Sequence, residues 1–315
     1  MNVDSSAATV AAAQTPAAGK LSLDHVAHFV PDMDEAARDF AQLGFALTPL
    51  SAQLHRLEPN GPLVPAGTAN RCVMFRRGYV ECLTPTGDTP VADQLRSAIE
   101  RYTGVHLIAF GTAAPEVDHA RLSGHGYAPV APVALQRQIG TLHGEDTARF
   151  TLVRVPPGTM PEGRIQFCQH HTPHLLWQPR WLAHDNHAVA LNAVILCVED
   201  AARTAARYAR FAGLEAAGAG DNWHIETQRG RLLFTSPAAL QRVFNIAPAT
   251  LPWIAGYVLA SDSMSATRNT IAASGYAHGD LGGERLYVVT PSSIGGVVVF
   301  EAQASAPFEL GRSGA

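Results

Sequence analysis

A pattern that occurs four times along the chain constrains its fold more than any other feature of the sequence. In the first copy, apolar residues 23–30 lead to Asp32, whose carboxylate can accept hydrogen bonds from the first turn of a helix. Apolar residues then recur at helical spacing up to Leu43, and Gly44 ends the helix. The interval from a reference residue in the first stretch to the stop glycine is 19 or 20 residues in every copy: His25 to Gly44, His106 to Gly126, Ala193 to Gly213 and Ala255 to Gly275.

Every copy also ends alike, because a glycine turn precedes a final apolar stretch. These stretches are residues 78–82, 163–167, 230–234 and 296–300. Two further strand-like segments separate the stop glycine from the final stretch. One helix and four strands per copy predict a βαβββ unit, and four such units predict an α+β fold.

Composition limits the classes of protein to which the chain can belong. Its 315 residues suit two domains, and 47% hydrophobic residues provide for sizeable cores. No apolar run approaches the roughly 20 residues that span a bilayer, and a net charge of −4 does not attract nucleic acid. We therefore expect a soluble, cytoplasmic protein with no membrane or nucleic-acid partner. Its four cysteines, none in a CxxC pair, are interpreted as buried free thiols: Cys72, Cys82, Cys168 and Cys197.

The repeat also predicts the domain boundaries. Residues 1–20 and 304–315 are expected to be tails, the first of them disordered, and residues 21–170 and 189–303 are expected to be the two domains. Residues 171–188 form the predicted crossover between them. Five histidines crowd residues 169–187, and because their spacing follows neither helix nor strand, a linker is favoured over a second metal site. They are His170, His171, His174, His184 and His187.

The four units differ at two corresponding positions, and these differences point to a site. The first-strand position holds His25, His106, Ala193 and Ala255, and the last-strand position holds Glu81, Gln166, Leu233 and Val299. Only the first two units are polar there. Burying an unpaired polar group costs about 1–3 kcal/mol, so four of them facing one cavity would be stabilised by a shared divalent cation.

The predicted metal ligands are therefore His25, Glu81, His106 and Gln166. Two imidazoles and a carboxylate match the ligand sets that hold Fe(II) or Zn(II) with open coordination positions. The simpler interpretation is that both histidines are ordinary core residues and that Glu81 lies at an exposed rim.

Three segments resemble the vicinal oxygen chelate superfamily, which includes glyoxalase I, extradiol dioxygenases and bleomycin-resistance proteins. They are Asp24-His25-Val26 leading to Val30-Pro31-Asp32, then Tyr79-Val80-Glu81-Cys82-Leu83, then Gly104-Val105-His106-Leu107-Ile108-Ala109. A glyoxalase-like domain group is most similar in layout. The resemblance implies that the units pair into two incompletely closed eight-stranded barrels. It also implies that the first barrel binds one divalent metal ion (Zn, Ni, Fe or Mn) through the four predicted ligands, with Gln166 departing from the carboxylate often found there.

The resemblance leaves three functions open. The first is a metal-dependent lyase or isomerase that acts on a small α-hydroxycarbonyl compound, with Glu81 as the catalytic group that moves a proton. The second is a non-haem Fe(II) extradiol-type dioxygenase using His25, His106 and Glu81. The third is a non-catalytic small-molecule binding or resistance protein. The C-terminal pair of units is expected to be a structural partner or the face of a homodimer.

Overall fold

A computed structural model describes residues 9–56 and 61–310, which form four βαβββ units joined in one continuous sheet. The first unit contains β1 (Ser22–Phe29), α2 (Met33–Gln42), β2 (Ser51–Arg56), β3 (Leu63–Met74) and β4 (Tyr79–Pro85). After α3 (Pro90–Arg101), the second contains β5 (Gly104–Gly111), α4 (Pro115–Gly124), β6 (Val133–Thr141), β7 (Gly144–Arg154) and β8 (Arg164–His170). The crossover contains α5 (Pro173–Leu176) and the short 3₁₀ helix η1 (Pro179–Trp181).

The C-terminal half repeats this order of elements. The third unit contains β9 (Ala188–Cys197), α6 (Ala201–Ala212), β10 (Ala216–Ala219), β11 (Asn222–Glu226) and β12 (Arg231–Thr235), and α7 (Pro237–Phe244) follows it. The fourth contains β13 (Trp253–Ser261), α8 (Met264–Ala273), β14 (His278–Gly282), β15 (Arg285–Val289) and β16 (Val297–Ala302). The predicted α+β class and the four units are therefore confirmed.

Helix ends follow the capping rules from which the repeat was recognised. The Asp32 carboxylate accepts hydrogen bonds of 2.9 Å from two backbone N–H groups at the start of α2. Asp200 caps α6 in the same way, and Gly213 ends that helix in the left-handed conformation with φ 65°. Such caps fix where each helix begins and ends.

The first eight strands close into a barrel in the order β1-β4-β3-β2-β6-β7-β8-β5, and β5 returns to β1. Closure between the two units depends on one pair of residues, Leu54 on β2 and Gln136 on β6. In the C-terminal half, β10 and β14 end the strand order, so among the described residues that set stays open. The predicted incompletely closed barrel is therefore found in the C-terminal half. The N-terminal barrel is closed, with one residue pair joining β2 to β6.

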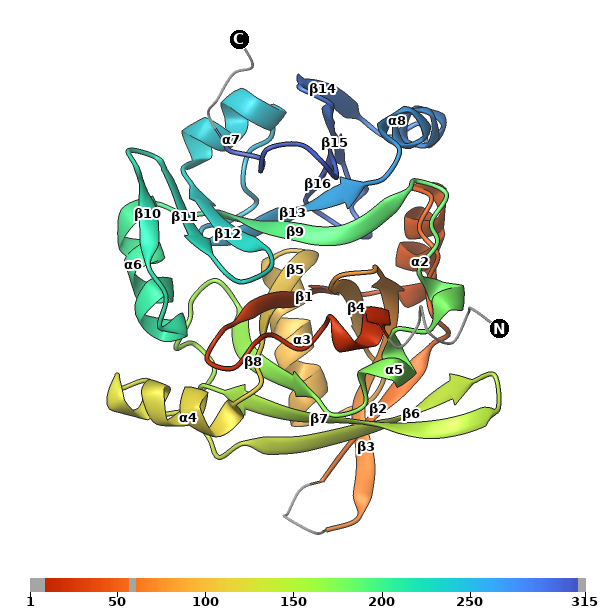
Figure 1. The fold of residues 1–315 in the computed structure, drawn as a ribbon, viewed down its shortest axis with the longest axis vertical. Helices are drawn as coiled ribbons and strands as arrows, with labels where there is room; N and C mark the ends of the chain where they lie inside the picture. Colours follow the sequence, from red (N-terminus) through yellow and green to blue (C-terminus); the bar gives the residue numbers. More distant parts are fainter. Residues whose placement is uncertain (1–8, 57–60, 311–315) are drawn as a thin grey trace.

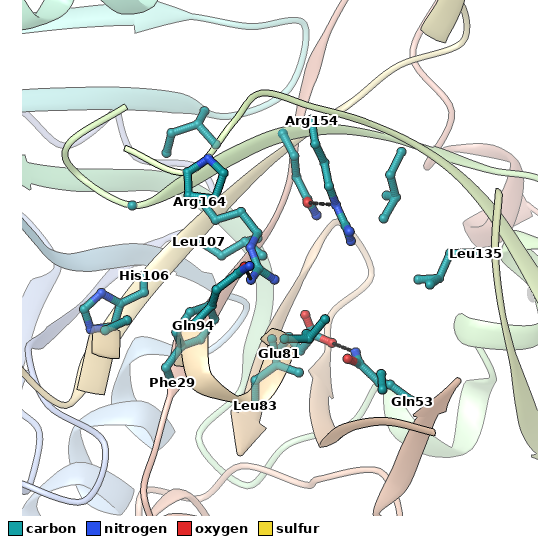
Figure 2. Close-up of a pocket in the computed structure, with 18 of the residues that line it drawn as sticks. Phe29, Gln53, Glu81, Leu83, Gln94, His106, Leu107, Leu135, Arg154 and Arg164 are labelled. Atoms are coloured by element: carbon teal, nitrogen blue, oxygen red, sulfur yellow. Dashed lines mark hydrogen bonds between the residues drawn. The ribbon is translucent and has the colours of Figure 1, made fainter. Parts of the chain in front are cut away.

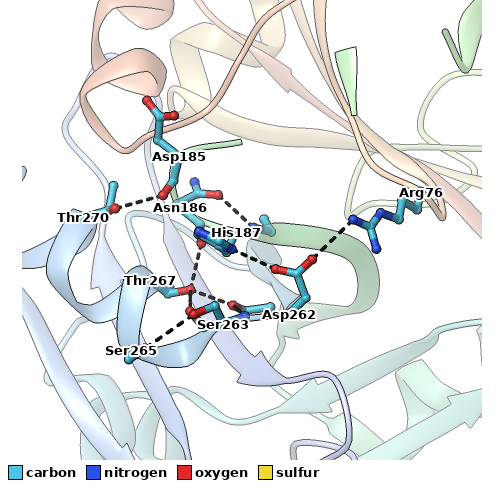
Figure 3. A network of polar contacts seen from close by, with 11 residues as sticks. Arg76, Asp185, Asn186, His187, Asp262, Ser263, Ser265, Thr267 and Thr270 are labelled. Carbon is cyan, nitrogen blue, oxygen red and sulfur yellow. Dashed lines mark hydrogen bonds and ion pairs between the residues drawn. The ribbon is translucent and has the colours of Figure 1, made fainter. Parts of the chain in front are cut away.

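Strands β9 and β13 lie between the N-terminal barrel and the remaining C-terminal strands (Figure 1). A pair between Val105 and Ile254 joins β5 to β13, which makes the sheet continuous across the two halves. Figure 3 shows a second connection, in which the crossover contacts the fourth unit. His187 lies 2.9 Å from Asp262, and Thr267 donates a 2.7 Å hydrogen bond to the carbonyl of Asn186.

The predicted tails pack against the barrels wherever the structure describes them. Gln14 is buried, donates to the carbonyl of Arg76 and accepts from the backbone of Gly78. Residues 9–20 therefore differ from the disordered tail expected for residues 1–20, and residues 1–8 lie outside the described part. At the other end, Phe308 and Leu310 are buried in the concave side of the C-terminal set, beside Phe244 of α7. They belong to the same hydrophobic cluster as the four aliphatic residues aligned with the predicted ligands: Ala193, Leu233, Ala255 and Val299.

All four cysteines are buried and free, as the sequence predicted. Trp177 is fully buried and its indole N–H donates to the carbonyl of Phe75, so it anchors the crossover to the first unit. No helix in the described residues is long and apolar enough to cross a membrane.

His28 joins the two halves of the molecule, and because its ring is buried we expect the stability of the protein to depend on pH. Its ring is buried, with Nδ1 donating to the carbonyl of Ile294 at 2.9 Å and Nε2 lying 3.2 Å from the hydroxyl of Tyr257. Burial lowers the pKa of His28 from 6.5 to about 4. The native ring therefore stays neutral between these pH values, while the ring in the unfolded chain binds a proton.

The free energy of unfolding should accordingly be insensitive to His28 above pH 6.5 and fall as the pH drops from 6.5 to 4. At about 1.36 kcal/mol per pKa unit, the loss attributable to His28 is up to about 3 kcal/mol. Urea unfolding of the wild type and of His28→Gln across this range measures it. The variant should be less stable near neutral pH but lose less stability on acidification, and equal slopes for the two proteins would contradict the assignment.

Candidate active site

A cavity of about 850 Å³ occupies the interior of the N-terminal barrel. All eight strands of this barrel line it together with α3, and Figure 2 shows part of its wall. This volume suits a small-molecule ligand. His25, Glu81, His106 and Gln166, the four predicted metal ligands, all lie on its wall.

Glu81 lies on β4 within a chain of polar side chains. The amides of Asn70 and Gln53 both donate to its Oε1, the second at 3.4 Å. Arg137 in turn donates a 2.9 Å hydrogen bond to the side-chain oxygen of Asn70, and Thr68 donates to Gln53 at 2.8 Å. Glu81 is 8% exposed, so this carboxylate is a buried, hydrogen-bonded part of the pocket wall and not a rim residue.

The imidazole of His25 is also buried and already has a partner. Its Nδ1 lies 2.6 Å from Oδ2 of Asp24, and its ring stacks on Tyr79 with 4.4 Å between ring centroids. The carboxylate therefore fixes the orientation of His25 and makes Nδ1 the donor.

The strand register corrects the equivalence predicted between His25 and His106. In the first unit His25 pairs with Tyr79, two residues before Glu81, and in the second unit Leu107 pairs with Arg164, two residues before Gln166. The corresponding residues of units three and four are Ala193, opposite Arg231, and Gly256, opposite Val297. Structural equivalents of His25 are therefore Leu107, Ala193 and Gly256, so the predicted alignment was wrong by one residue in units two and four.

An irregularity in the sheet accounts for the shift in the second unit. Ala27 pairs with Leu107 but His28 pairs with Val105, so His106 is the extra residue of a bulge between β1 and β5. Spacing to the stop glycine cannot reveal a bulge within the strand. The fourth unit has the same irregularity, because Ile254 pairs with Leu196 but Gly256 pairs with Ile195, which leaves Ala255 as the extra residue of a bulge between β13 and β9.

The bulge turns His106 toward a partner other than Glu81. Its Nε2 lies 2.7 Å from the carbonyl oxygen of Tyr102, and its ring stacks on Tyr102 with 3.9 Å between centroids. Burial lowers the pKa of His106 to about 4, so the imidazole is neutral at pH 7. Figure 2 shows the ring directed away from Glu81. In this respect His106 behaves as the core histidine of the simpler interpretation.

The two histidines and the carboxylate of the predicted ligand set do not lie around one point in the structure. The ligand atoms of His25, Glu81 and His106 do not all approach within 4.8 Å of one another in the part of the chain that the structure describes. Oε1 of Gln166 accepts a 3.1 Å hydrogen bond from Nε of Arg154. The role of the four residues as a metal-binding set stays a prediction.

The feature that sequence reasoning missed is a set of three arginines in the same pocket: Arg137 on β6, Arg154 at the end of β7 and Arg164 at the start of β8. All three are partly buried. Figure 2 shows Arg154 and Arg164 extending toward Glu81. Burial lowers the pKa of Arg154, and burial together with the charge of Arg154 lowers the pKa of Arg164 to about 10. All three remain cations at pH 7.

The electrostatic character of the pocket follows from these groups. Three guanidinium ions face Glu81, which is the one carboxylate among the recessed lining residues, since Asp93 is exposed and paired with Arg96. Bringing two positive guanidiniums close together in a recessed site is unfavourable unless an anion compensates them. A divalent cation would add to this positive charge, whereas a ligand with two negative charges would balance it.

A second polar cluster borders the pocket. Its histidine, His170, was predicted from the sequence to belong to the linker region. His170, the last residue of β8, lies 2.9 Å from Oδ2 of Asp24, and its Nε2 lies 3.7 Å from Sγ of Cys168. Burial opposes the imidazolium form, but the charge and hydrogen bond of Asp24 raise the pKa of His170 to about 10. In the described residues this is the one group of three or more His, Cys, Asp or Glu with ligand atoms within 4.8 Å.

Comparisons with known proteins agree with this architecture. The model of a glyoxalase-like domain family matches residues 23–212, which is more than half of the chain. A search of curated proteins finds no match.

Solved structures share the fold at low identity. A hypothetical protein from Staphylococcus aureus has a TM-score of 0.60 and 11% identity over 90% of this chain and 99% of its own. A variant of 4-hydroxymandelate synthase from Streptomyces coelicolor has a TM-score of 0.50 and 13% identity over 92% and 95% of the two chains. A xylose isomerase-like TIM barrel/4-hydroxyphenylpyruvate dioxygenase fusion protein has a TM-score of 0.54 and 11% identity over 94% of this chain and 51% of its own.

These neighbours establish the fold, while the match to the family model establishes the family. The chain belongs to the glyoxalase-like domain family, the group that its sequence was found to resemble.

Proposed function

We propose that this protein is an enzyme that binds a small, doubly anionic, oxygen-rich substrate in the N-terminal barrel and moves a proton on it through Glu81. The reaction class is that of an isomerase or lyase acting on an α-hydroxycarbonyl compound. One observation carries the proposal, namely that Arg137, Arg154 and Arg164 line the same pocket as a single recessed carboxylate, that of Glu81.

The chemistry requires only groups that line the pocket. The Glu81 carboxylate removes the proton from the carbon atom that carries the hydroxyl group; the electron pair of that C–H bond forms a C=C bond, and the π pair of the carbonyl moves to its oxygen. The isomerisation is completed when the hydroxyl proton passes to that oxygen and Glu81 returns its proton to the former carbonyl carbon, so no further reactant is needed. Proton transfer by a positioned carboxylate typically contributes about 10²–10⁴-fold to a rate.

The guanidinium groups have two tasks in this scheme. They bind the carboxylate or phosphate of the substrate, for which the planar, five-donor guanidinium is well suited. They also stabilise the negative charge that develops on the carbonyl oxygen, and preorganised donors of this kind are usually the largest single catalytic contribution. In the related metal-dependent mechanism predicted from the sequence, a divalent ion would supply this positive charge.

The dioxygenase alternative has less support in the site. It needs two imidazoles and one carboxylate around one iron, and His25, Glu81 and His106 do not form such a group in the described residues. The 4-hydroxymandelate synthase variant and the 4-hydroxyphenylpyruvate dioxygenase fusion protein share the fold at 11–13% identity, and this similarity is evidence for the fold and not for the reaction. A non-catalytic binder would use the same arginines but would not need Glu81 as a base.

A deuterium-exchange experiment tests the proposal. The protein is incubated in D₂O with a panel of doubly anionic α-hydroxycarbonyl compounds, namely hydroxyketo dicarboxylic acids and phosphorylated hydroxyketones, and loss of the proton on the hydroxyl-bearing carbon is followed by NMR. We expect exchange at least about 100-fold above the uncatalysed rate for one panel member. Tight binding without exchange would show a binding protein instead, and oxygen uptake by the Fe(II)-treated protein with catechols would show a dioxygenase.

A further inference from the structure

The cluster of Asp24, Cys168 and His170 is produced by an irregularity in the first strand. Leu23 pairs with Phe110 and His25 with Ala109, so Asp24 is the extra residue of a bulge in β1. A bulge redirects a side chain that would otherwise follow the alternation of the strand. It brings the carboxylate of Asp24 to β8, where Cys168 and His170 lie two residues apart and therefore face the same side of the sheet.

The cluster is almost completely buried, yet several of its polar atoms have no hydrogen-bond partner in the described residues. Asp24 is fully buried, Cys168 is 2% exposed, and the side chain of His170 is 4% exposed. Oδ1 of Asp24, Nδ1 of His170 and Oγ of the neighbouring Ser22 are buried without a hydrogen-bond partner among the described residues. Unpaired buried polar atoms are costly, at about 1–3 kcal/mol each, so their concentration here needs an explanation.

We propose that Asp24, Cys168 and His170 bind a zinc ion. Carboxylate oxygen, imidazole nitrogen and thiolate sulfur are the three ligand types that zinc prefers in proteins. Tetrahedral zinc with bonds of about 2.0 Å to N or O and about 2.3 Å to S separates neighbouring ligand atoms by about 3.3–3.6 Å. The corresponding separations are 2.9 Å between Asp24 and His170 and 3.7 Å between His170 and Cys168, so small adjustments would accommodate the ion.

The surroundings complete the site in the manner of known zinc centres. Zinc ligands are usually oriented by further hydrogen bonds, and Nδ1 of His25 supplies one to Asp24 at 2.6 Å. Zinc binding would displace the protons of the Cys168 thiol and the His170 imidazolium to solvent. The resulting set of one dipositive ion, one carboxylate, one thiolate and one neutral imidazole is neutral overall, so this site adds no positive charge beside the arginines. Cys168 and His25 also line the cavity, which places the ion at its wall, where an open coordination position could accept an oxygen atom of a bound molecule.

Cobalt substitution tests the site without any assay of activity. The purified protein is treated with a chelator, dialysed and titrated with Co²⁺. We expect a near-ultraviolet thiolate-to-cobalt absorption that saturates at about one equivalent per chain and is abolished by competing zinc. The Cys168→Ser variant should lose this absorption, and His170→Gln should weaken cobalt binding by at least about 10-fold.

Two matched variants make the result specific. Cys197→Ser alters another buried thiol, on β9, that belongs to no such group in the described residues, so it should leave the absorption unchanged. Glu81→Gln should also leave it unchanged, because Glu81 belongs to the other predicted ligand set. Circular dichroism confirms that each variant is folded. A folded wild type without the thiolate absorption, or an absorption that survives Cys168→Ser, would overturn the proposal. The outcome is independent of the exchange experiment on the proposed function.

Discussion

Replacing Glu81 by glutamine is expected to lower the rate of substrate deuterium exchange by about 10²–10⁴-fold, the usual contribution of a general base. Glutamine has the shape of glutamate, and its side-chain oxygen can still accept the hydrogen bonds from Asn70 and Gln53. It cannot take up the substrate proton at neutral pH. Binding should be retained or become tighter, because the substitution removes the negative charge that faces three guanidiniums.

A catalytic role predicts a lower exchange rate with retained affinity, whereas a structural role would lower both. Isothermal titration calorimetry gives the affinity, and NMR gives the exchange rate on the same samples. The Asp93→Asn variant is a suitable control, because Asp93 also lines the cavity but is exposed at its rim and paired with Arg96. It should change neither quantity. If Glu81→Gln exchanges at the wild-type rate, Glu81 is not the base.

The double variant Arg154→Met, Arg164→Met is expected to lose measurable affinity for small dianions, with malonate and inorganic phosphate as the probes. Truncating one partner of a buried charge pair typically costs about 2–5 kcal/mol, which corresponds to at least about a 30-fold weaker affinity for each single variant. Methionine keeps much of the length of the arginine side chain, so the wall of the pocket remains covered while the charge is removed.

A variant on the same strand provides the control for this experiment. Arg149 lies on β7 like Arg154 but is exposed and outside the main cavity. Arg149→Met should leave malonate affinity within about 1 kcal/mol of the wild type, as is usual for exposed charges. A wild type that binds neither probe, or a double variant with unchanged affinity, would contradict an anion-binding pocket.

The repeat carried most of the information that could be predicted about the fold. Helix caps such as Asp32 and stop glycines such as Gly213 act through their own backbone neighbours, so they can be recognised from local sequence. The antiparallel pairing of the first strands makes His25 equivalent to Leu107 independently, because His25 pairs with Ala109 and Leu107 pairs with Ala27. Glu81 and Gln166 then hold corresponding positions, each two residues after the partner of that residue, and the same relation holds for Leu233 and Val299.

The candidate site could be predicted only in part, because two bulges in the first strands of the units change which side chains face the barrel interior. One bulge displaces His106 from the position equivalent to His25, and the other turns Asp24 toward β8. Each inserts a single residue into a strand pair, which leaves hydrophobic spacing and the interval to the stop glycine almost unchanged. Sequence reasoning therefore placed His106 at the position equivalent to His25 and assigned His170 to a linker.

The sequence by itself determined the α+β class, the four βαβββ units and the positions of Glu81 and Gln166 on their strands, since these follow from local capping and alternation. Only the tertiary structure decided that Arg137, Arg154 and Arg164 share one cavity with Glu81, and that Asp24 meets Cys168 and His170. These groups are far apart in sequence, and the closure and local register of the barrel bring them together. The spacing of residues within one strand reveals neither how the barrel closes nor the register in which its strands pair.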